Sequence, residues 1–196
     1  NLVSPTHVIL PILRALGIAY ELGLSIPLVY NSNGYEKADV IRHLDGIIDI
    51  YLPDLKYLSV QAAETYSAAP DYFSHASTAI REMHRQKPSL VLAEGETARE
   101  GLIIRHLVLP GLVEDSVAIL EWLAESFSST VCLSLMSQYY PSFKAPEELQ
   151  RPLRPEEYQE VLARAEELGF ETMFIQPGVF SPEDHLIPDF SLAEPF

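Results

Sequence analysis

The 196-residue sequence has a single cysteine, Cys132, and no apolar run near the length that a membrane-spanning helix needs. One cysteine cannot form an internal disulfide, and a thiol inside an apolar stretch is typical of a small buried hydrophobic residue. This favours a reducing, cytoplasmic location. Because a membrane-spanning helix takes about 20 apolar residues, we also expect no membrane partner.

Basic residues are scarce as well. The chain has 13 Lys and Arg against 28 Asp and Glu, which gives a formal net charge of −15. The field of such a chain repels nucleic acid, and no stripe of Lys or Arg offsets it, so we expect no nucleic-acid partner. The negative net charge does not indicate a particular substrate, because an acidic surface more often keeps a protein soluble than it attracts a basic partner.

Several motifs of common enzymes are missing. The sequence has no glycine-rich phosphate loop, no Gly-x-Ser-x-Gly elbow, no paired-carboxylate signature and no Cys cluster. Its 6 histidines show no His-Glu-x-x-His spacing, so we predict no histidine-based metal site. Hydrolase and kinase functions therefore lose support.

Helical and strand-like segments alternate along the chain. Helical spacing of apolar residues predicts helices at 9–22, 37–44, 114–125 and 155–168, with one or two more between 61 and 86, interrupted near Pro70. Apolar runs predict strands at 2–3, 26–30, 47–52, 102–109, 130–136 and 172–175. About six parallel strands with helical crossovers predict an α/β fold, a partial, open (β/α)6 barrel. We expect this barrel over residues 1–180 and an irregular tail over 181–196.

Short polar segments follow the strands. They are Ser4 to Thr6, Asn31 to Tyr35, Asp54 to Lys56, Arg105 and His106 with Pro110 and Gly111, and Ser137 to Tyr139. Because the carboxyl ends of parallel strands converge on one edge of a sheet, where ligands usually bind, we expect the chemistry to lie along that rim.

Each polar tip also has an ordinary structural explanation. Asp54 and Lys56 lie on one face of a strand, where they hold a ligand or form a surface ion pair worth about 0–1 kcal/mol. The Asn-Ser-Asn-Gly segment after residue 30 is a common turn composition. Arg105 and His106 point to opposite faces, so at most one faces the barrel interior, and a buried arginine there needs an anion such as a ligand carboxylate.

Five segments in order are NLVSPTH at 1–7, PLVYNSNGYE at 27–36, DIYLPDLKY at 49–57, RHLVLPG at 105–111 and SLMSQYYP at 134–141. Together they resemble the radical S-adenosylmethionine (radical SAM) proteins related to pyruvate formate-lyase activating enzyme. The resemblance spans nearly the whole chain. It implies an iron-sulfur oxidoreductase in which a 4Fe-4S cluster cleaves S-adenosylmethionine to a 5′-deoxyadenosyl radical that abstracts a hydrogen from the substrate. A glycyl-radical enzyme or another protein is then the expected partner.

The resemblance also implies which residues bind S-adenosylmethionine. By position they are Ser4, Pro5 and Thr6 at the tip that holds the methionine amine, Asn31 and Asn33 near the ribose, the polar pair Asp54 and Lys56, and Arg105 and Gln138 at later tips. The amine tip departs from the common form, because Gly-Gly-Glu is replaced here by Ser-Pro-Thr.

The Cys-x-x-x-Cys-x-x-Cys motif that the family carries after its first strand is absent, and Cys132 cannot replace three thiolates. We therefore expect that this chain alone binds no cluster, and that it is a fragment of a parent enzyme whose first strand is missing. An unpaired edge at Asn1 then favours self-association. Two alternatives stay open. One is a non-catalytic barrel module that has lost the cluster and binds an adenosyl ligand or a protein partner. The other is a lyase or aldolase that uses Lys56 as a Schiff-base amine.

Overall fold

A computed structural model describes residues 1–94, 97–141 and 145–176 of the chain. The strands are β1 (Leu2–Val3), β2 (Val29–Ser32), β3 (Ile50–Pro53), β4 (Val91–Leu92), β5 (Ala98–Leu107), β6 (Cys132–Met136) and β7 (Met173–Ile175). The helices are α1 (Ile9–Glu21), α2 (Ala38–Arg42), α3 (Val60–Ser67), α4 (Tyr72–Gln86), α5 (Val113–Phe127) and α6 (Pro155–Glu167), with short 3-10 helices η1 (Pro5–Val8) and η2 (Glu147–Leu149).

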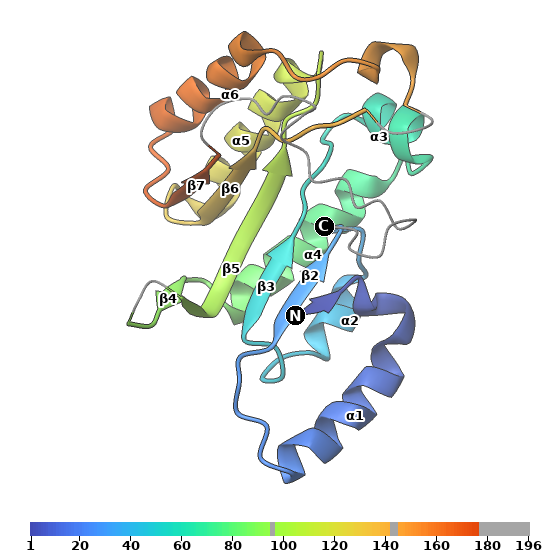
Figure 1. Cartoon of the computed structure of the whole chain (residues 1–196), viewed down its shortest axis with the longest axis vertical. Helices are drawn as coiled ribbons and strands as arrows, with labels where there is room; N and C mark the ends of the chain where they lie inside the picture. Colours follow the sequence, from blue (N-terminus) through green and yellow to red (C-terminus); the bar gives the residue numbers. More distant parts are fainter. Residues whose placement is uncertain (95–96, 142–144, 177–196) are drawn as a thin grey trace, which may run out of the picture.

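The strands form one sheet in the order β1-β2-β3-β5-β6-β7, and every neighbouring pair in this order is parallel (Figure 1). Helices lie in the connections between these parallel strands, as parallel pairing requires. The fold is therefore an open, barrel-like α/β sheet, and the predicted fold class is confirmed. The expected tail over 181–196 lies outside the described residues.

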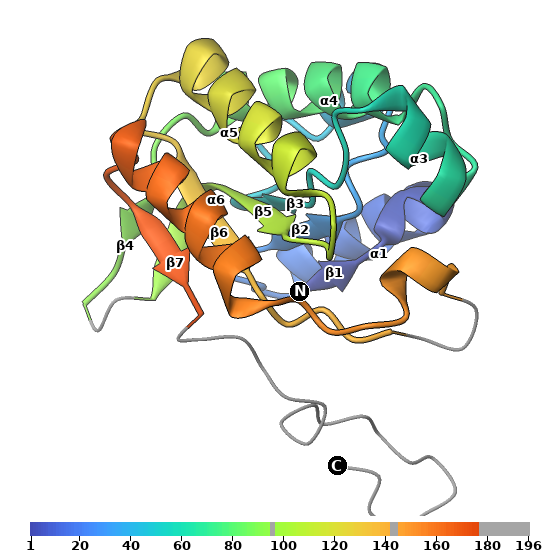
Figure 2. The ribbon, with the colours of Figure 1, turned by 90° about the horizontal axis from the view of Figure 1, so that it is seen from above.

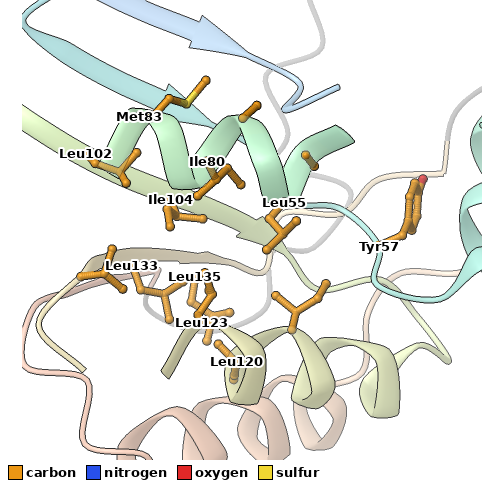
Figure 3. Packing of buried hydrophobic residues seen from close by; sticks show 14 of the residues in the cluster. Leu55, Tyr57, Ile80, Met83, Leu102, Ile104, Leu120, Leu123, Leu133 and Leu135 are labelled. Atoms are coloured by element: carbon orange, nitrogen blue, oxygen red, sulfur yellow. The ribbon is translucent and has the colours of Figure 1, made fainter. Parts of the chain in front are cut away.

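Helices α4 and α5 cover one face of the sheet (Figure 2). The main core lies between this face and the helices, where Ile80 and Met83 of α4 and Leu120 and Leu123 of α5 are fully buried (Figure 3). We call this the helix-covered face of the sheet, and the opposite one the inner face. Side chains alternate between the two faces along each strand.

The alternation is clear on β5. Leu102, Ile104 and His106 are buried on the helix-covered face, whereas Ile103 and Arg105 on the inner face are only half-buried. None of the helices in the described part of the chain is both long enough and apolar enough to span a membrane.

Some predicted boundaries were wrong. The strand predicted at 26–30 lies at Val29–Ser32, because parallel pairing with β1 and β3 carries extended backbone into residues interpreted as a turn. Strand β5 begins at Ala98 rather than at residue 102, since its first residues pair with the unpredicted β4 in an antiparallel hairpin. The predicted interruption near Pro70 is confirmed, because α3 ends at Ser67 and α4 begins at Tyr72.

Candidate ligand-binding site at the carboxyl edge of the sheet

Four of the predicted site residues form a charged cluster where β2, β3 and β5 end. The Asp54 carboxylate lies 3.1 Å from Lys56 Nζ and 2.6 Å from Arg105 Nη2. Arg105 Nη2 also donates a hydrogen bond to Asn31 Oδ1 at 2.8 Å. The cluster thus holds one carboxylate between two cations and links three neighbouring strand ends.

Strand geometry explains why these side chains meet. Asp54 and Arg105 form a parallel bridge just beyond β3, and Leu55 N donates to the Arg105 carbonyl at 2.8 Å. Asp54 and Lys56 are two residues apart, so both point to the inner face. They form the ion pair that was one of the two explanations open for them, and the ligand contact stays a prediction. The anion that Arg105 Nη2 contacts in the structure is Asp54, whereas a ligand carboxylate at Arg105 stays a prediction.

His106 lies on the other face of β5, as the alternation predicts. Its Nδ1 lies 2.7 Å from the Leu55 carbonyl oxygen and its Nε2 lies 2.9 Å from Ser116 Oγ. Because a carbonyl only accepts, Nδ1 carries the proton and Nε2 accepts from the serine hydroxyl in the neutral ring. Burial lowers the pKa of His106. This histidine is therefore a core residue that fixes the end of β3 and does not reach the inner face.

A second group of polar side chains surrounds Glu36, which is buried just after β2. Thr6 Oγ1 donates to Glu36 Oε1 at 2.5 Å and lies 3.0 Å from the Tyr30 hydroxyl. Since a threonine hydroxyl has one proton, Tyr30 is the donor in the second bond. Burial raises the pKa of the Glu36 carboxyl, although the hydrogen bond from Thr6 opposes that shift.

A cavity of about 250 Å³ opens beside this group. Its lining residues are Ser4, Thr6, His7, Asn33, Tyr35 and Glu36. Three predicted site residues therefore meet a carboxylate that the sequence analysis did not select. Ser4 adopts a left-handed conformation with φ 48°, and its amide donates to the Asn31 carbonyl at 2.8 Å, which ties η1 to the end of β2.

Tyr72 and Gly34 hold the ends of β2 and β3 together. The Tyr72 hydroxyl lies 2.9 Å from the Asn33 carbonyl and 3.0 Å from the Asp54 carbonyl, and it accepts from Lys56 N at 3.0 Å. A Cβ on Gly34, whose φ is +78°, would lie 2.1 Å from the Asp54 carbonyl oxygen. The residue must therefore be glycine for the two loops to approach this closely.

The described part of the chain contains three buried side-chain polar atoms without a hydrogen-bond partner, and all three lie at this edge. They are Glu36 Oε2, Asp54 Oδ1 and Arg105 Nε. Asp54 Oδ1 is close to Arg105 Nη2, but the guanidinium N–H does not point at it, so the ion pair leaves its hydrogen-bonding capacity unused. Buried polar atoms are rarely left unpaired, because each costs about 1–3 kcal/mol. Their clustering is the strongest sign of a ligand site.

The remaining predicted residues take other places. Pro5 is buried as the first residue of η1, and Asn33 Oδ1 accepts from Tyr35 N at 3.0 Å, so its side chain shapes the turn. Gln138 is exposed just beyond β6, and none of the described hydrogen bonds joins it to the charged cluster. The sequence analysis missed Glu36 and Tyr72, although Glu36 ends the NSNGYE segment that it quoted.

The sequence of this chain is similar to parts of several known proteins. The chain matches no protein-family model. It is 30% identical over 174 residues to an uncharacterized protein of Methanocaldococcus jannaschii, covering 87% of this chain and 46% of that protein. It is 24% identical to a lipoyl synthase of Beutenbergia cavernae, covering 80% of this chain and 51% of the enzyme. A lipoyl synthase of Mycobacterium avium is 26% identical, with coverages of 86% and 59%.

Lipoyl synthases are radical SAM enzymes. Their sequence similarity supports the place of this chain in the radical SAM superfamily. The chain spans about half the length of the curated relatives that it matches. Among solved structures, a domain of pyruvate-formate lyase-activating enzyme from Bacteroides vulgatus aligns with a TM-score of 0.48 at 15% identity, covering 71% of this chain and 74% of that domain.

The residues of this chain do not fit an iron-sulfur cluster. Cys132 lies buried on β6, and burial raises the pKa of its thiol to about 11. A 4Fe-4S cluster of this superfamily needs several thiolates, and a single buried thiol cannot supply them. Among the residues with described positions, no group of three or more His, Cys, Asp or Glu side chains is arranged to hold a metal ion.

Proposed function

We propose that this chain binds S-adenosylmethionine across the ends of β1, β2, β3 and β5, as the cofactor-binding and substrate-facing part of a radical SAM enzyme. The observation that carries the proposal is that three buried atoms without a hydrogen-bond partner, Glu36 Oε2, Asp54 Oδ1 and Arg105 Nε, cluster at this single edge. The two carboxylate oxygens accept hydrogen bonds, and the guanidinium nitrogen donates one. A matching ligand therefore has ammonium or hydroxyl groups that donate and an anionic group that accepts.

S-adenosylmethionine has that combination of groups. In the proposed complex the α-ammonium donates to Glu36 Oε2 in the cavity beside Thr6, where burial strengthens a charge-assisted hydrogen bond. A ribose hydroxyl donates to Asp54 Oδ1, and the α-carboxylate accepts from Arg105 Nε. Glu36 thus provides the carboxylate that the Ser-Pro-Thr tip lacks.

The finer assignment is an activity like that of pyruvate formate-lyase activating enzymes, with a glycyl-radical enzyme as the protein substrate. Its support is the order of the five sequence segments. In such enzymes the cluster supplies the electron that cleaves the cofactor. Because Cys132 does not fit a cluster, we assign cofactor binding to this chain and no part of that electron transfer.

Calorimetric titration of S-adenosylmethionine into the 196-residue chain tests the proposal. Glu36→Gln and Asp54→Asn keep side-chain size but remove charge, so each should weaken binding about tenfold or more, since hydrogen bonds to charged groups are worth about 1.5–3 kcal/mol. Asp39→Asn is the matched control. Asp39 is an exposed carboxylate on α2 that pairs with Arg42, and its replacement should leave the affinity unchanged.

Two analogues assign the contacts. S-adenosyl-4-methylthiobutyrate lacks only the ammonium, so Glu36→Gln should not weaken its binding further. 5′-Methylthioadenosine also lacks the carboxylate, so Arg105→Gln should weaken S-adenosylmethionine much more than this analogue. If the wild-type chain binds none of the three ligands, or if the variants bind S-adenosylmethionine as tightly as the wild type, the proposed site is wrong.

The non-catalytic alternative predicts the same binding and differs at the level of activity. Reductive cleavage of S-adenosylmethionine by the full-length protein under reductant would favour the enzyme. A full-length protein that binds the cofactor but leaves it intact would favour the binding module. The aldolase alternative has little support, because Lys56 is 40% exposed and paired with Asp54, whereas Schiff-base lysines are desolvated or lie beside another cation.

A further inference from the structure

A second cavity of about 250 Å³ lies at the same edge of the sheet. Three tyrosines, Tyr57, Tyr66 and Tyr139, form its aromatic part, and Leu109 and Leu149 are among its aliphatic lining residues. Tyr57 follows Lys56 directly and Tyr139 follows Gln138 directly. The cavity therefore adjoins the proposed cofactor site but shares none of the residues assigned to it.

The aromatic rings are held in place by the surrounding chain. The ring centres of Tyr57 and Tyr66 are 6.2 Å apart, and Tyr57 packs edge-on against Tyr72 at 5.6 Å. Tyr57 is buried, whereas Tyr66 and Tyr139 are half-buried and keep part of their surface open to the cavity. These rings are thus preorganised to contact a ligand.

The hydroxyl groups of the same tyrosines already have partners. The Tyr66 hydroxyl donates to Glu148 Oε1 at 3.2 Å, and the Tyr139 hydroxyl donates to the Leu149 carbonyl at 2.9 Å. The Tyr57 hydroxyl accepts from Ser67 Oγ at 3.3 Å. The three tyrosine hydroxyls are thus engaged within the chain, and the rings are what these side chains offer to a ligand.

Charge around the cavity favours a cation. None of its described lining residues is charged, and the hydroxyl of its lining residue Tyr66 bonds to the carboxylate of Glu148. The chain as a whole carries a formal charge of −15. Aromatic faces attract cations, and methylated ammonium groups are a common ligand of tyrosine and tryptophan cages.

We propose that this cavity binds a methylated ammonium group of the substrate. Such a group carries positive charge but few or no N–H donors, so it suits a site that offers tyrosine rings whose hydroxyls already have partners. A cavity of about 150 Å³ already holds benzene, so 250 Å³ accommodates a trimethylammonium group with part of its chain. The role as a substrate anchor rests on the proposed function, whereas binding itself does not.

Choline and 3,3-dimethylbutan-1-ol are the probes, because they have the same shape and differ in charge. Proton NMR titration of the wild-type chain should shift the choline N-methyl signal upfield through the ring currents of the tyrosines. Choline should bind at least about fivefold more tightly than the neutral alcohol. A peptide with trimethyllysine, compared with the same peptide carrying unmodified lysine, tests whether a protein substrate presents the group.

Tyr66→Leu should weaken choline binding at least about fivefold and reduce the upfield shift, and Glu148→Gln should weaken it less. Tyr20→Leu is the control, because Tyr20 is a half-exposed tyrosine on α1 at the amino ends of the strands. Tyr139→Leu provides a second cavity variant if Tyr66→Leu does not fold. Equal affinity for the two probes, or no choline binding at 20 mM by a folded wild type, overturns the inference. Because choline is titrated without S-adenosylmethionine, either result is independent of cofactor binding.

Discussion

The two faces of β3 and β5 differ in how deeply their side chains are buried and in how completely their polar atoms are hydrogen-bonded. On the helix-covered face Ile104 is fully buried, and the polar His106 has a partner for each ring nitrogen. On the inner face Ile103 is half-buried, and Asp54 and Arg105 keep buried atoms without hydrogen-bond partners. The same strands thus have a packed core with satisfied hydrogen bonds on one side and a polar surface with unsatisfied hydrogen-bonding atoms on the other. Incomplete hydrogen bonding, more than charge itself, distinguishes the face that meets a ligand.

The largest effect should come from the helix-covered face. Ile104→Ala should lower the free energy of unfolding by about 3–4 kcal/mol, because it leaves a cavity in the packed core. Ile103→Ala, one residue earlier on the inner face, should cost only about 1 kcal/mol. Urea unfolding of both variants measures the difference. Equal losses would mean that the two faces are packed alike and would remove the basis of the comparison.

The second test concerns the junction between the two strand ends. Gly34→Ala should destabilise by about 2–4 kcal/mol, because the added Cβ meets the Asp54 carbonyl and the backbone has a positive φ. Gly46→Ala has nearly the same φ, +76°, but nothing within 4 Å of its Cβ, so it should cost only about 1 kcal/mol. Thermal unfolding separates the two. S-adenosylmethionine affinity should fall in Gly34→Ala alone, and an unchanged affinity would show that the close approach does not shape the site.

The third test uses pH. Burial lowers the pKa of His106, so the unfolded chain binds more protons than the folded chain below the ordinary histidine pKa of about 6.5. Stability should therefore be fully present above that pH and should fall as the pH drops from 7 to 5.5, by at most about 1.4 kcal/mol per pH unit. His106→Gln should have a shallower slope in urea unfolding at the two pH values.

Glu36 acts in the opposite direction, because burial raises its pKa and its contribution falls as the pH rises above the ordinary carboxyl value. It is unchanged in His106→Gln, so it cancels in the comparison of slopes. A variant as steep as the wild type would show that another group causes the acid loss.

The smallest effect is expected at Asn33. Its side-chain oxygen is used by the Tyr35 amide, so Asn33→Ala should change S-adenosylmethionine affinity by less than about threefold and stability by about 0.5–1 kcal/mol. Calorimetry beside the Asp54→Asn variant gives the ratio. A tenfold loss in Asn33→Ala would mean that the turn rearranges so that this side chain contacts the ligand. That result would favour the role near the ribose that the family resemblance implies over the turn contact seen in the structure.

Two expectations from the sequence stay predictions. The self-association expected from an edge at Asn1 and the cytoplasmic location are not tested by the fold. The edge strand β1 pairs with β2 alone among the described strands, and α1 beside it has no fully buried residue, with Leu10, Ile18 and Leu22 exposed. Sedimentation of the chain over a range of concentrations would decide the first.

The local pattern was enough to predict most elements. Apolar period and helix-stopping residues located α1, α4, α5 and α6 within a few residues, because those signals depend on neighbours in the sequence. The β4–β5 hairpin was missed, since β4 contributes only Val91 and Leu92, and both are exposed. An element that buries little leaves little periodicity to detect.

The candidate site divides in the same way. The sequence by itself placed Asn31, Asp54, Lys56 and Arg105 at strand ends, because parallel strands of one sheet end on the same edge. Only the tertiary structure decided that Arg105 is neutralised by Asp54, that Asn33 serves the turn, and that Glu36 faces the Thr6 tip with one oxygen unpaired. Alternation along a strand fixes which way a side chain points, whereas its partner is fixed by loops that meet from distant parts of the chain.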